Sequence, residues 1–185
     1  MFGYVNLPIG EICKIQRGKV ISKQEIVNQK GIYPVYSSQT ENDGKLGCIN
    51  TFMYDGEYLT WTTDGANAGT VFLRQGKFNI TNVCGLLDSN TALADIHFLY
   101  YSLSMVSKLY VKRGMGNAKL MSNEMAKIKI KLPSLIIQHK IAKILDNFSK
   151  IVFDISSGLP AEIEARQKQY EYYRDKLLDF KEKKG

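Results

Sequence analysis

Short apolar runs separated by turn residues dominate the first two thirds of the chain. β-branched and aromatic residues cluster, as in short strands, at residues 32–37, 59–63, 70–73, 78–81 and 83–87. Glycine beside asparagine, aspartate or glutamine predicts the intervening turns, at Asn42–Gly44, Asp55–Gly56, Asp64–Gly65 and Gln75–Gly76. Short strands at this spacing predict a curved or barrel-like β domain.

Apolar residues between Ile96 and Leu109 recur every three or four positions, which predicts a helix inserted into this domain. Residues 113–118 contain two glycines and predict an exposed basic loop. Apolar residues then alternate with lysine from Met125 to Leu132, which predicts a strand that Pro133 ends.

Long helices are predicted after Pro133, which makes the overall fold class α+β. Isoleucine and phenylalanine recur at heptad spacing along a helix from about 135 to 156, at Ile137, Ile141, Ile144, Phe148, Ile151 and Ile155. A second amphipathic helix is predicted at about 160–182, with Pro160 in its first turn, where the missing N–H is tolerated. The interruption between them fits either a turn or a kink in one long helix.

The second predicted helix is about 35 Å long at 1.5 Å per residue, which exceeds what a compact domain of this size needs. Ordinary packing within one domain is the alternative for its apolar stripe. Because no second copy of the stripe lies within the chain, we expect another chain to cover it. The predicted interface consists of Leu159, Ile163, Tyr170, Tyr173 and Leu177.

The composition is that of a folded domain, with 185 residues of which 44% are hydrophobic and 23% charged. No apolar run approaches the ~18 residues of a membrane span, and the first residues lack the pattern of a signal peptide. The three cysteines, Cys13, Cys48 and Cys84, form no CxxC pair, which disfavours a disulfide framework and a zinc site. We expect a cytoplasmic protein with free thiols and no cofactor of its own.

The net charge of +7 resides entirely in residues 1–150, which hold 18 basic and 11 acidic residues. Residues 151–185 hold seven of each. Positive charge is densest at 108–131, where seven basic residues accompany Glu124 alone. Such a surface attracts polyanions, and nucleic acid is the usual partner; a merely basic protein is the alternative.

Sequence motifs of catalysis are missing: the chain has no phosphate-binding loop, no GxGxxG, no GxSxG and no HExxH. Asp55, Glu57 and Asp64 would be the candidates for a metal site, although carboxylates beside glycine are usually turn residues. His97, at the start of an apolar helix, is interpreted as structural. These observations favour a binding protein over an enzyme.

Two polar stretches have the residue types that read base edges and hold phosphates. Glutamine and asparagine can pair with adenine, arginine with guanine, and lysine with phosphate. The candidate DNA contacts are Ser38, Gln39, Lys45, Thr63, Lys112, Arg113, Asn117 and Lys119. Thr63 is included because it follows Trp61, itself expected in the core. Solvated loops without a ligand are the alternative.

Two stretches of the helical part match a known pattern: Gly158–Arg174, GLPAEIEARQKQYEYYR, and Lys131–Asp146, KLPSLIIQHKIAKILD. The first resembles the conserved region of the specificity (S) subunits of type I restriction–modification enzymes, and the second resembles the entry into the helix of that region. Leu7–Ile12, LPIGEI, resembles the family's opening, and Tyr54–Leu59 with Asp64–Ala66 resembles its middle.

The resemblance implies a division into a target recognition domain, residues 1–134, and a conserved helical region, residues 135–185. It implies a non-catalytic subunit that reads double-stranded DNA and recruits modification (methyltransferase) and restriction subunits. The former use S-adenosylmethionine, and the latter use ATP and Mg²⁺.

Family members usually carry two recognition domains and two conserved regions, whereas this chain has one of each. The resemblance therefore implies a half-subunit, natural or excised, that homodimerises through an antiparallel coiled coil. A two-fold dimer would read an interrupted palindrome. The alternative is an assembly protein that pairs with another S chain and competes for methyltransferase without reading DNA.

Overall fold

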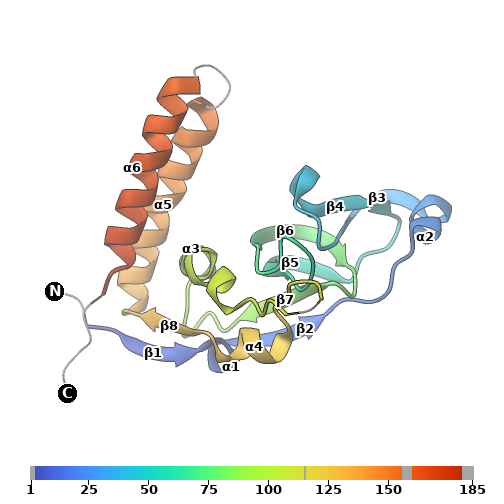
Figure 1. Ribbon diagram of the computed structural model, residues 1–185, viewed down its shortest axis with the longest axis horizontal. Coiled ribbons are helices and arrows are strands. Elements are labelled where there is room, and N and C mark those ends of the chain that lie inside the picture. The colour runs from blue at the N-terminus through green and yellow to red at the C-terminus, as the bar shows by residue number, and fades with distance from the viewer. Residues whose placement is uncertain (1–2, 115, 156–159, 181–185) are drawn as a thin grey trace.

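The computed structural model describes residues 3–114, 116–155 and 160–180, in which a sheet-containing part stands beside two long helices (Figure 1). A six-stranded sheet is formed by β2 Cys13–Arg17, β3 Lys30–Tyr36, β4 Lys45–Ile49, β5 Tyr54–Thr62, β6 Val71–Ile80 and β7 Cys84–Ser89. A two-stranded sheet pairs β1 Val5–Pro8 with β8 Lys129–Leu132.

The helices are α1 Ile9–Ile12, α2 Lys23–Asn28, α3 Ile96–Val106, α4 Ser122–Lys127, α5 Leu135–Ile155 and α6 Pro160–Leu178, with 3-10 turns η1 Glu41–Gly44 and η2 Ser107–Tyr110. We call α5 and α6 the helical hairpin, and residues 3–134 the sheet part. No helix in the described ranges has both the length and the apolar character required to cross a bilayer.

The larger sheet is open. Its strands lie in the order β2-β7-β5-β6-β3-β4, and neighbours are antiparallel except β3 and β6, which are parallel. Within the described residues β2 and β4 are its edges, and they do not pair with each other. A barrel requires the edge strands to meet, so the expectation of a barrel-like domain is corrected.

Two of the predicted turns lie inside strands. Gly56 and Gly76 are partners in the β5–β6 ladder and have φ values of 144° and 84°, which glycine adopts readily. The ladder therefore continues past both glycines, and the strands predicted at 70–73 and 78–81 are one strand. The turn predicted at Asn42–Gly44 is confirmed, since all three residues have positive φ.

The sheet part buries side chains on both faces of its sheet. On one face Trp61 and Leu87 join a cluster with residues of α3 and α4, while Leu86 joins Phe78 and Ile80 in a second cluster. Adjacent residues Leu86 and Leu87 point into different clusters because side chains alternate along a strand. Trp61 is 0% exposed, which confirms its expected place in the core.

The strand predicted from Met125 to Leu132 is shorter than expected. Its first three residues belong to α4, which ends at Lys127, and β8 begins only at Lys129. In β8 the two lysines are exposed and Ile130 and Leu132 are buried, so the alternating pattern holds over this shorter stretch.

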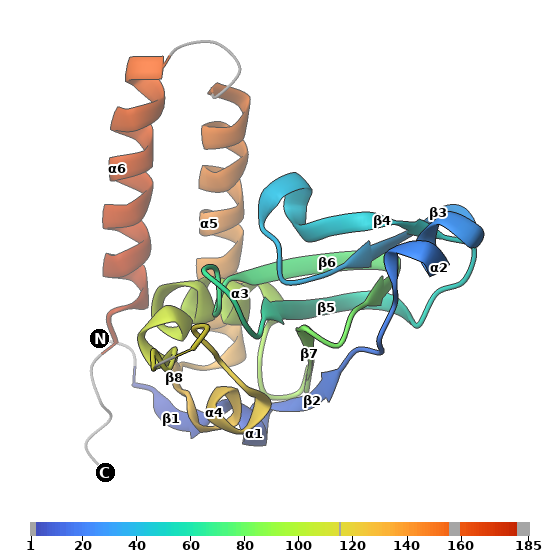
Figure 2. The ribbon, with the colours of Figure 1, turned by 45° about the vertical axis from the view of Figure 1, so that its right-hand side comes forward.

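The two long helices lie side by side and run in opposite directions (Figures 1 and 2). The chain therefore turns back rather than continuing as one kinked helix; the connecting residues 156–159 lie outside the described ranges. α5 begins and ends within one residue of the prediction, whereas α6 ends at Leu178, earlier than expected.

The apolar stripe of α6 has its partner within this chain. Tyr173 stacks on Phe148 of α5 with ring centroids 5.7 Å apart. Tyr170 and Leu177 pack against the main core, which is the cluster that contains Trp61 and Leu87. The expectation that the stripe has no partner within the chain is therefore wrong for these residues. Ile163 is half-buried, and Leu159 lies outside the described residues.

α3 connects the two parts of the molecule. His97 contacts Asp146 of α5 through Nδ1 at 3.0 Å and Glu57 of β5 through Nε2 at 3.3 Å. Tyr101 also donates a hydrogen bond to Asp146, at 2.7 Å. Burial alone lowers the pKa of His97, but the carboxylates of Asp146 and Glu57 outweigh it and raise this pKa above its ordinary value.

Candidate nucleic-acid interface

Residues 112–119 are called the basic loop, and their described members, 112–114 and 116–119, lie at the surface as the two sides of a short hairpin. Lys112 and Lys119 exchange backbone hydrogen bonds of 2.9 and 3.0 Å, which close the loop at its base. Between them Arg113 and Asn117 are exposed. The sequence prediction of an exposed basic loop is confirmed at Arg113, Gly114, Gly116 and Asn117, whereas Ala118 is half-buried.

The base of the loop is fixed to the core. Leu120, which follows the loop, is 0% exposed, and its N–H donates to the carbonyl of Thr63 at 2.8 Å. The indole N–H of Trp61 donates to the carbonyl of Leu120, also at 2.8 Å. Ala118 accepts a 3.0 Å hydrogen bond from Gly65 N–H. The exposed basic loop is therefore fixed to the core through the buried Leu120.

A second polar loop, residues 37–45, is closed by Gln39, whose amide N–H donates to the carbonyl of Lys45 at 2.6 Å. Arg74 stabilises η1, because its Nη2 donates to the carbonyl of Asp43 at 2.7 Å. The same guanidinium lies 3.6 Å from the centre of the Tyr36 ring. Ser38, Gln39 and Lys45 are half-buried. One amide hydrogen of Gln39 is thus used within the loop.

The turn between β5 and β6, residues 64–70, joins these two loops. Asn67 donates from Nδ2 to Thr40 Oγ1 at 2.8 Å, while Gly65 contacts Ala118 of the basic loop. The three segments therefore follow one another at the end of the sheet where α3 lies (Figure 2). Segments far apart in sequence form one continuous polar edge.

Thr63 differs from the other predicted contacts. Its side chain is 0% exposed, and its hydroxyl contacts Asp64 Oδ1 at 3.2 Å and Arg17 Nη2 at 3.4 Å. A buried hydroxyl cannot touch a base edge, so in this structure Thr63 supports the edge from inside. Arg17 is half-buried on β2 and also donates to the carbonyl of Asn82. Its contact with Thr63 was not predicted, because a lone arginine in a strand carries no sequence signal.

Glu124, at the start of α4, neutralises part of the positive charge beside the basic loop. The ammonium groups of Lys112 and Lys127 both lie 3.0 Å from its Oε1. Hydrogen bonds from Lys112 and then Lys127 hold the pKa of Glu124 below its usual range. Glu124 is therefore firmly ionised at neutral pH.

The carboxylates considered for a metal site are dispersed. Asp55 faces Lys77 at 3.9 Å, Glu57 faces His97, and Asp64 lies beside Thr63. No group of three or more histidine, cysteine or acidic residues suited to a metal ion occurs in the described part of the chain.

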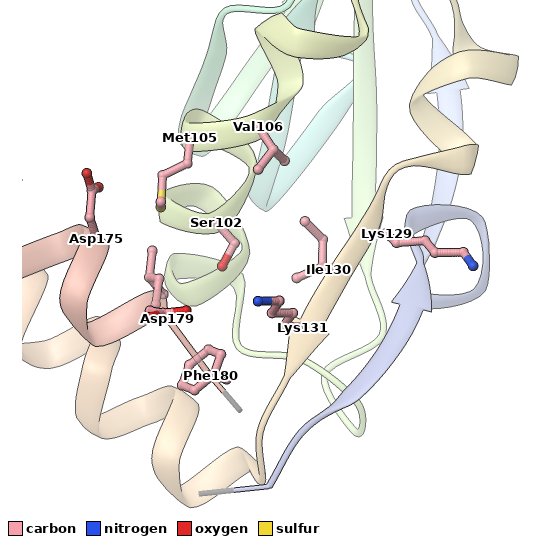
Figure 3. Close-up of a pocket in the computed structure, with 10 residues that line it drawn as sticks. Ser102, Met105, Val106, Lys129, Ile130, Lys131, Asp175, Asp179 and Phe180 are labelled. Atoms are coloured by element: carbon pink, nitrogen blue, oxygen red, sulfur yellow. The ribbon is translucent and has the colours of Figure 1, made fainter. Parts of the chain in front are cut away.

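A pocket of about 260 Å³ lies between α3, β8 and the end of α6 (Figure 3). Its apolar lining includes Met105, Val106 and Ile130, and Lys131 and Asp179 approach it from two sides (Figure 3). It borders the junction of the helical hairpin with the two-stranded sheet, and it draws no lining residue from the basic loop.

The chain matches a family model and has relatives of known class. The family model described as "Type I restriction modification DNA specificity domain" matches residues 2–165. The chain is 44% identical over 172 residues to the type I restriction enzyme MpnII specificity subunit of Mycoplasma pneumoniae, an alignment that covers 93% of this chain and 52% of that subunit. The chain thus spans about half the length of this relative.

A shorter relative matches almost end to end. The putative type I specificity subunit S.MpnORF289P N-terminus of Mycoplasma pneumoniae is 46% identical over 175 residues, covering 92% of this chain and 94% of its own. Among solved structures, the S subunit of a type I restriction–modification system from M. genitalium superposes with a TM-score of 0.71 at 17% identity, covering 84% of this chain and 41% of that one. At this identity the superposition establishes a shared fold.

Proposed function

This chain belongs to the type I restriction–modification DNA specificity family, and we propose that it is a non-catalytic specificity subunit that reads one half of a bipartite DNA target. In this proposal residues 1–134 are the target recognition domain and residues 135–185 are the conserved helical region. The observation that carries the proposal is the basic loop, an exposed hairpin that Leu120 anchors to the core and that contacts two further polar loops in turn.

The charges and residue types along this edge support roles for individual side chains. Lys45, Lys112, Arg113 and Lys119 supply positive charge for phosphates, while Ser38, Gln39 and Asn117 supply hydrogen-bonding groups for base edges. Thr63 supports the loop from inside. Arginine donates in a fork that matches guanine, so Arg113 is the foremost candidate for a base contact in the loop.

The test is selection of bound duplexes from a random-sequence pool, followed by binding assays with Arg113→Ala. If Arg113 reads guanine, the variant loses about 1–3 kcal/mol on the preferred sequence and accepts other bases at one position. Lys77→Ala, on β6 outside these loops and outside the helical hairpin, is the control and leaves both unchanged. An equal loss on all sequences would make Arg113 a phosphate contact, and failure of the wild-type chain to select any sequence would refute DNA reading.

We also propose that the helical hairpin joins this chain to partners: a second copy, methyltransferase subunits and restriction subunits. Support comes from apolar side chains that remain exposed on it, including Ile144 at 40%, Ile151 at 47% and Tyr172 at 59%. Because Tyr170, Tyr173 and Leu177 already contact the rest of the chain, the contact with another copy would use the outer side of the hairpin.

A two-fold homodimer would present its two recognition domains in opposite senses, and so would read an interrupted palindrome. α5, with 21 residues, is about 32 Å long, which corresponds to half-sites at least ~10 base pairs apart. Light scattering tests this assembly, with twice the 21.0 kDa mass of one chain as the expected result. A monomer at all concentrations would favour pairing with a different S chain.

A further inference from the structure

Glu124 occupies an unusual position for an acidic residue, since it is the one carboxylate within the basic stretch 108–131. It lines a surface hollow of about 310 Å³ together with the base of the basic loop and Asn117. The side chain of Glu124 is 16% exposed, so it lies in this hollow rather than projecting into solvent.

The backbone holds Glu124 in place. Glu124 lies in the first turn of α4, and its N–H donates to the carbonyl of Met121 at 3.0 Å. α4 itself is fixed by Met125, which is 0% exposed in the main core. The carboxylate is therefore positioned by a buried anchor one residue away.

A carboxylate disfavours binding to phosphates, because like charges repel. At this position the repulsion is offset by Lys112 and Lys127, each 3.0 Å from Oε1. An ionised carboxylate accepts hydrogen bonds and cannot donate them. In the major groove its complements are the amino groups of cytosine and adenine, whereas the keto oxygens of guanine and thymine are acceptors.

We propose that Glu124 is a base-reading residue, whose carboxylate accepts a hydrogen bond from the exocyclic amino group of a cytosine or adenine in the target. Lys112 and Lys127 hold the carboxylate and carry the charge that neighbouring phosphates require. Keto-bearing bases are rejected at this position by acceptor–acceptor repulsion. This inference rests on the proposed DNA-reading function and assigns one of its specificity residues.

The experiment compares wild type, Glu124→Gln and Asp55→Asn by selection from random duplexes and by binding at several salt concentrations. Asp55 is the control, because its carboxylate also faces a lysine, Lys77, at 3.9 Å, and it lies on β5 outside the three loops and outside the helical hairpin. Both variants remove one negative charge. At one target position we expect wild type to prefer an amino-bearing base, cytosine or adenine, over the keto-bearing bases by roughly tenfold. Glu124→Gln should lose this preference, because its amide N–H can donate to the keto oxygens.

Glu124→Asp separates base reading from a purely electrostatic effect, since it keeps the charge and withdraws the oxygens by one methylene. Base reading predicts that it also loses the roughly tenfold discrimination, while circular dichroism remains that of wild type. Tighter binding of Glu124→Gln to all sequences with unchanged ranking, or wild-type selectivity in both Glu124 variants, would overturn the assignment. A wild-type chain that selects no sequence would instead refute the proposed function on which it rests.

Discussion

The sheet part and the helical hairpin differ in how many sides support each element. Strands β5, β6 and β7 have buried side chains on both faces, and even the polar Arg74 is 2% exposed within this part. The hairpin buries one stripe, including Ile141 and Leu145, and leaves most of its remaining surface exposed. Two-sided support suits loops that must be held accurately, while one-sided support leaves surface for partners.

Trp61→Ala tests the two-sided support most severely. The variant removes a fully buried ring and its hydrogen bond to Leu120, and we expect a loss of about 3–5 kcal/mol in the free energy of unfolding. Tyr172→Ala, which truncates an exposed ring on α6, is expected to cost less than about 0.5 kcal/mol in the monomer. Urea unfolding measures both, and equal losses would remove the contrast between the two parts.

Leu145→Ala tests the one buried stripe of the hairpin. Leu145 is 0% exposed, so its truncation should cost about 2–4 kcal/mol, whereas the neighbouring Ile144, 40% exposed, should cost about 1 kcal/mol or less. The same urea titrations compare them. Similar losses for the two variants would mean that α5 is supported on both sides.

Arg74→Met tests the polar support of η1. The variant leaves Thr60 Oγ1 and the Asp43 carbonyl without their donor, and we expect a loss of about 2 kcal/mol. Lys77→Met on the same strand breaks an exposed pair with Asp55 and should cost less than about 0.5 kcal/mol. If Arg74→Met were equally mild, its buried position would contribute little to the stability of this loop.

His97 links the sheet part to the helical hairpin through ion pairs that depend on pH, and its replacement should change the free energy of unfolding least. Since its pKa is raised on folding, its stabilisation is fully present below the unfolded pKa of 6.5 and is lost as pH rises through the folded value. His97→Asn should therefore cost less than about 1 kcal/mol, and cost more at about pH 5.5 than at about pH 8.5. Asp146→Asn should weaken the same pH dependence. A cost that grows toward alkaline pH would contradict this coupling.

The sequence predicted elements whose pattern is local. The heptad spacing of isoleucine defines α5, and the glycines of residues 113–118 define an exposed loop. The pattern missed the pairing of Gly56 with Gly76, because residue type alone does not distinguish a glycine in a turn from one in a ladder. It also missed β1, β2 and β4, whose short runs carry little periodicity.

The candidate site shows the same difference between local features, which were predicted, and contacts between distant residues, which were not. The exposure of Arg113 and Asn117 follows from local composition, and it was predicted. Thr63 is buried where its carbonyl bonds to the distant Leu120, and Lys112 pairs with Glu124 across a turn of the chain. Both contacts join residues far apart in sequence, so local composition did not predict them. The intramolecular partner of α6 was missed for the same reason, since a heptad pattern does not say which helix faces it.

The burial of Trp61 gives the chain an optical probe of its own. It is the one tryptophan in the sequence, and it is buried on β5 with its N–H bonded to Leu120, so its fluorescence responds to opening of the sheet part. α5 and α6, with 21 and 19 residues, dominate the far-ultraviolet circular dichroism. Coincident transitions of the two signals in urea would define one cooperative unit, and separate transitions would give each part its own stability.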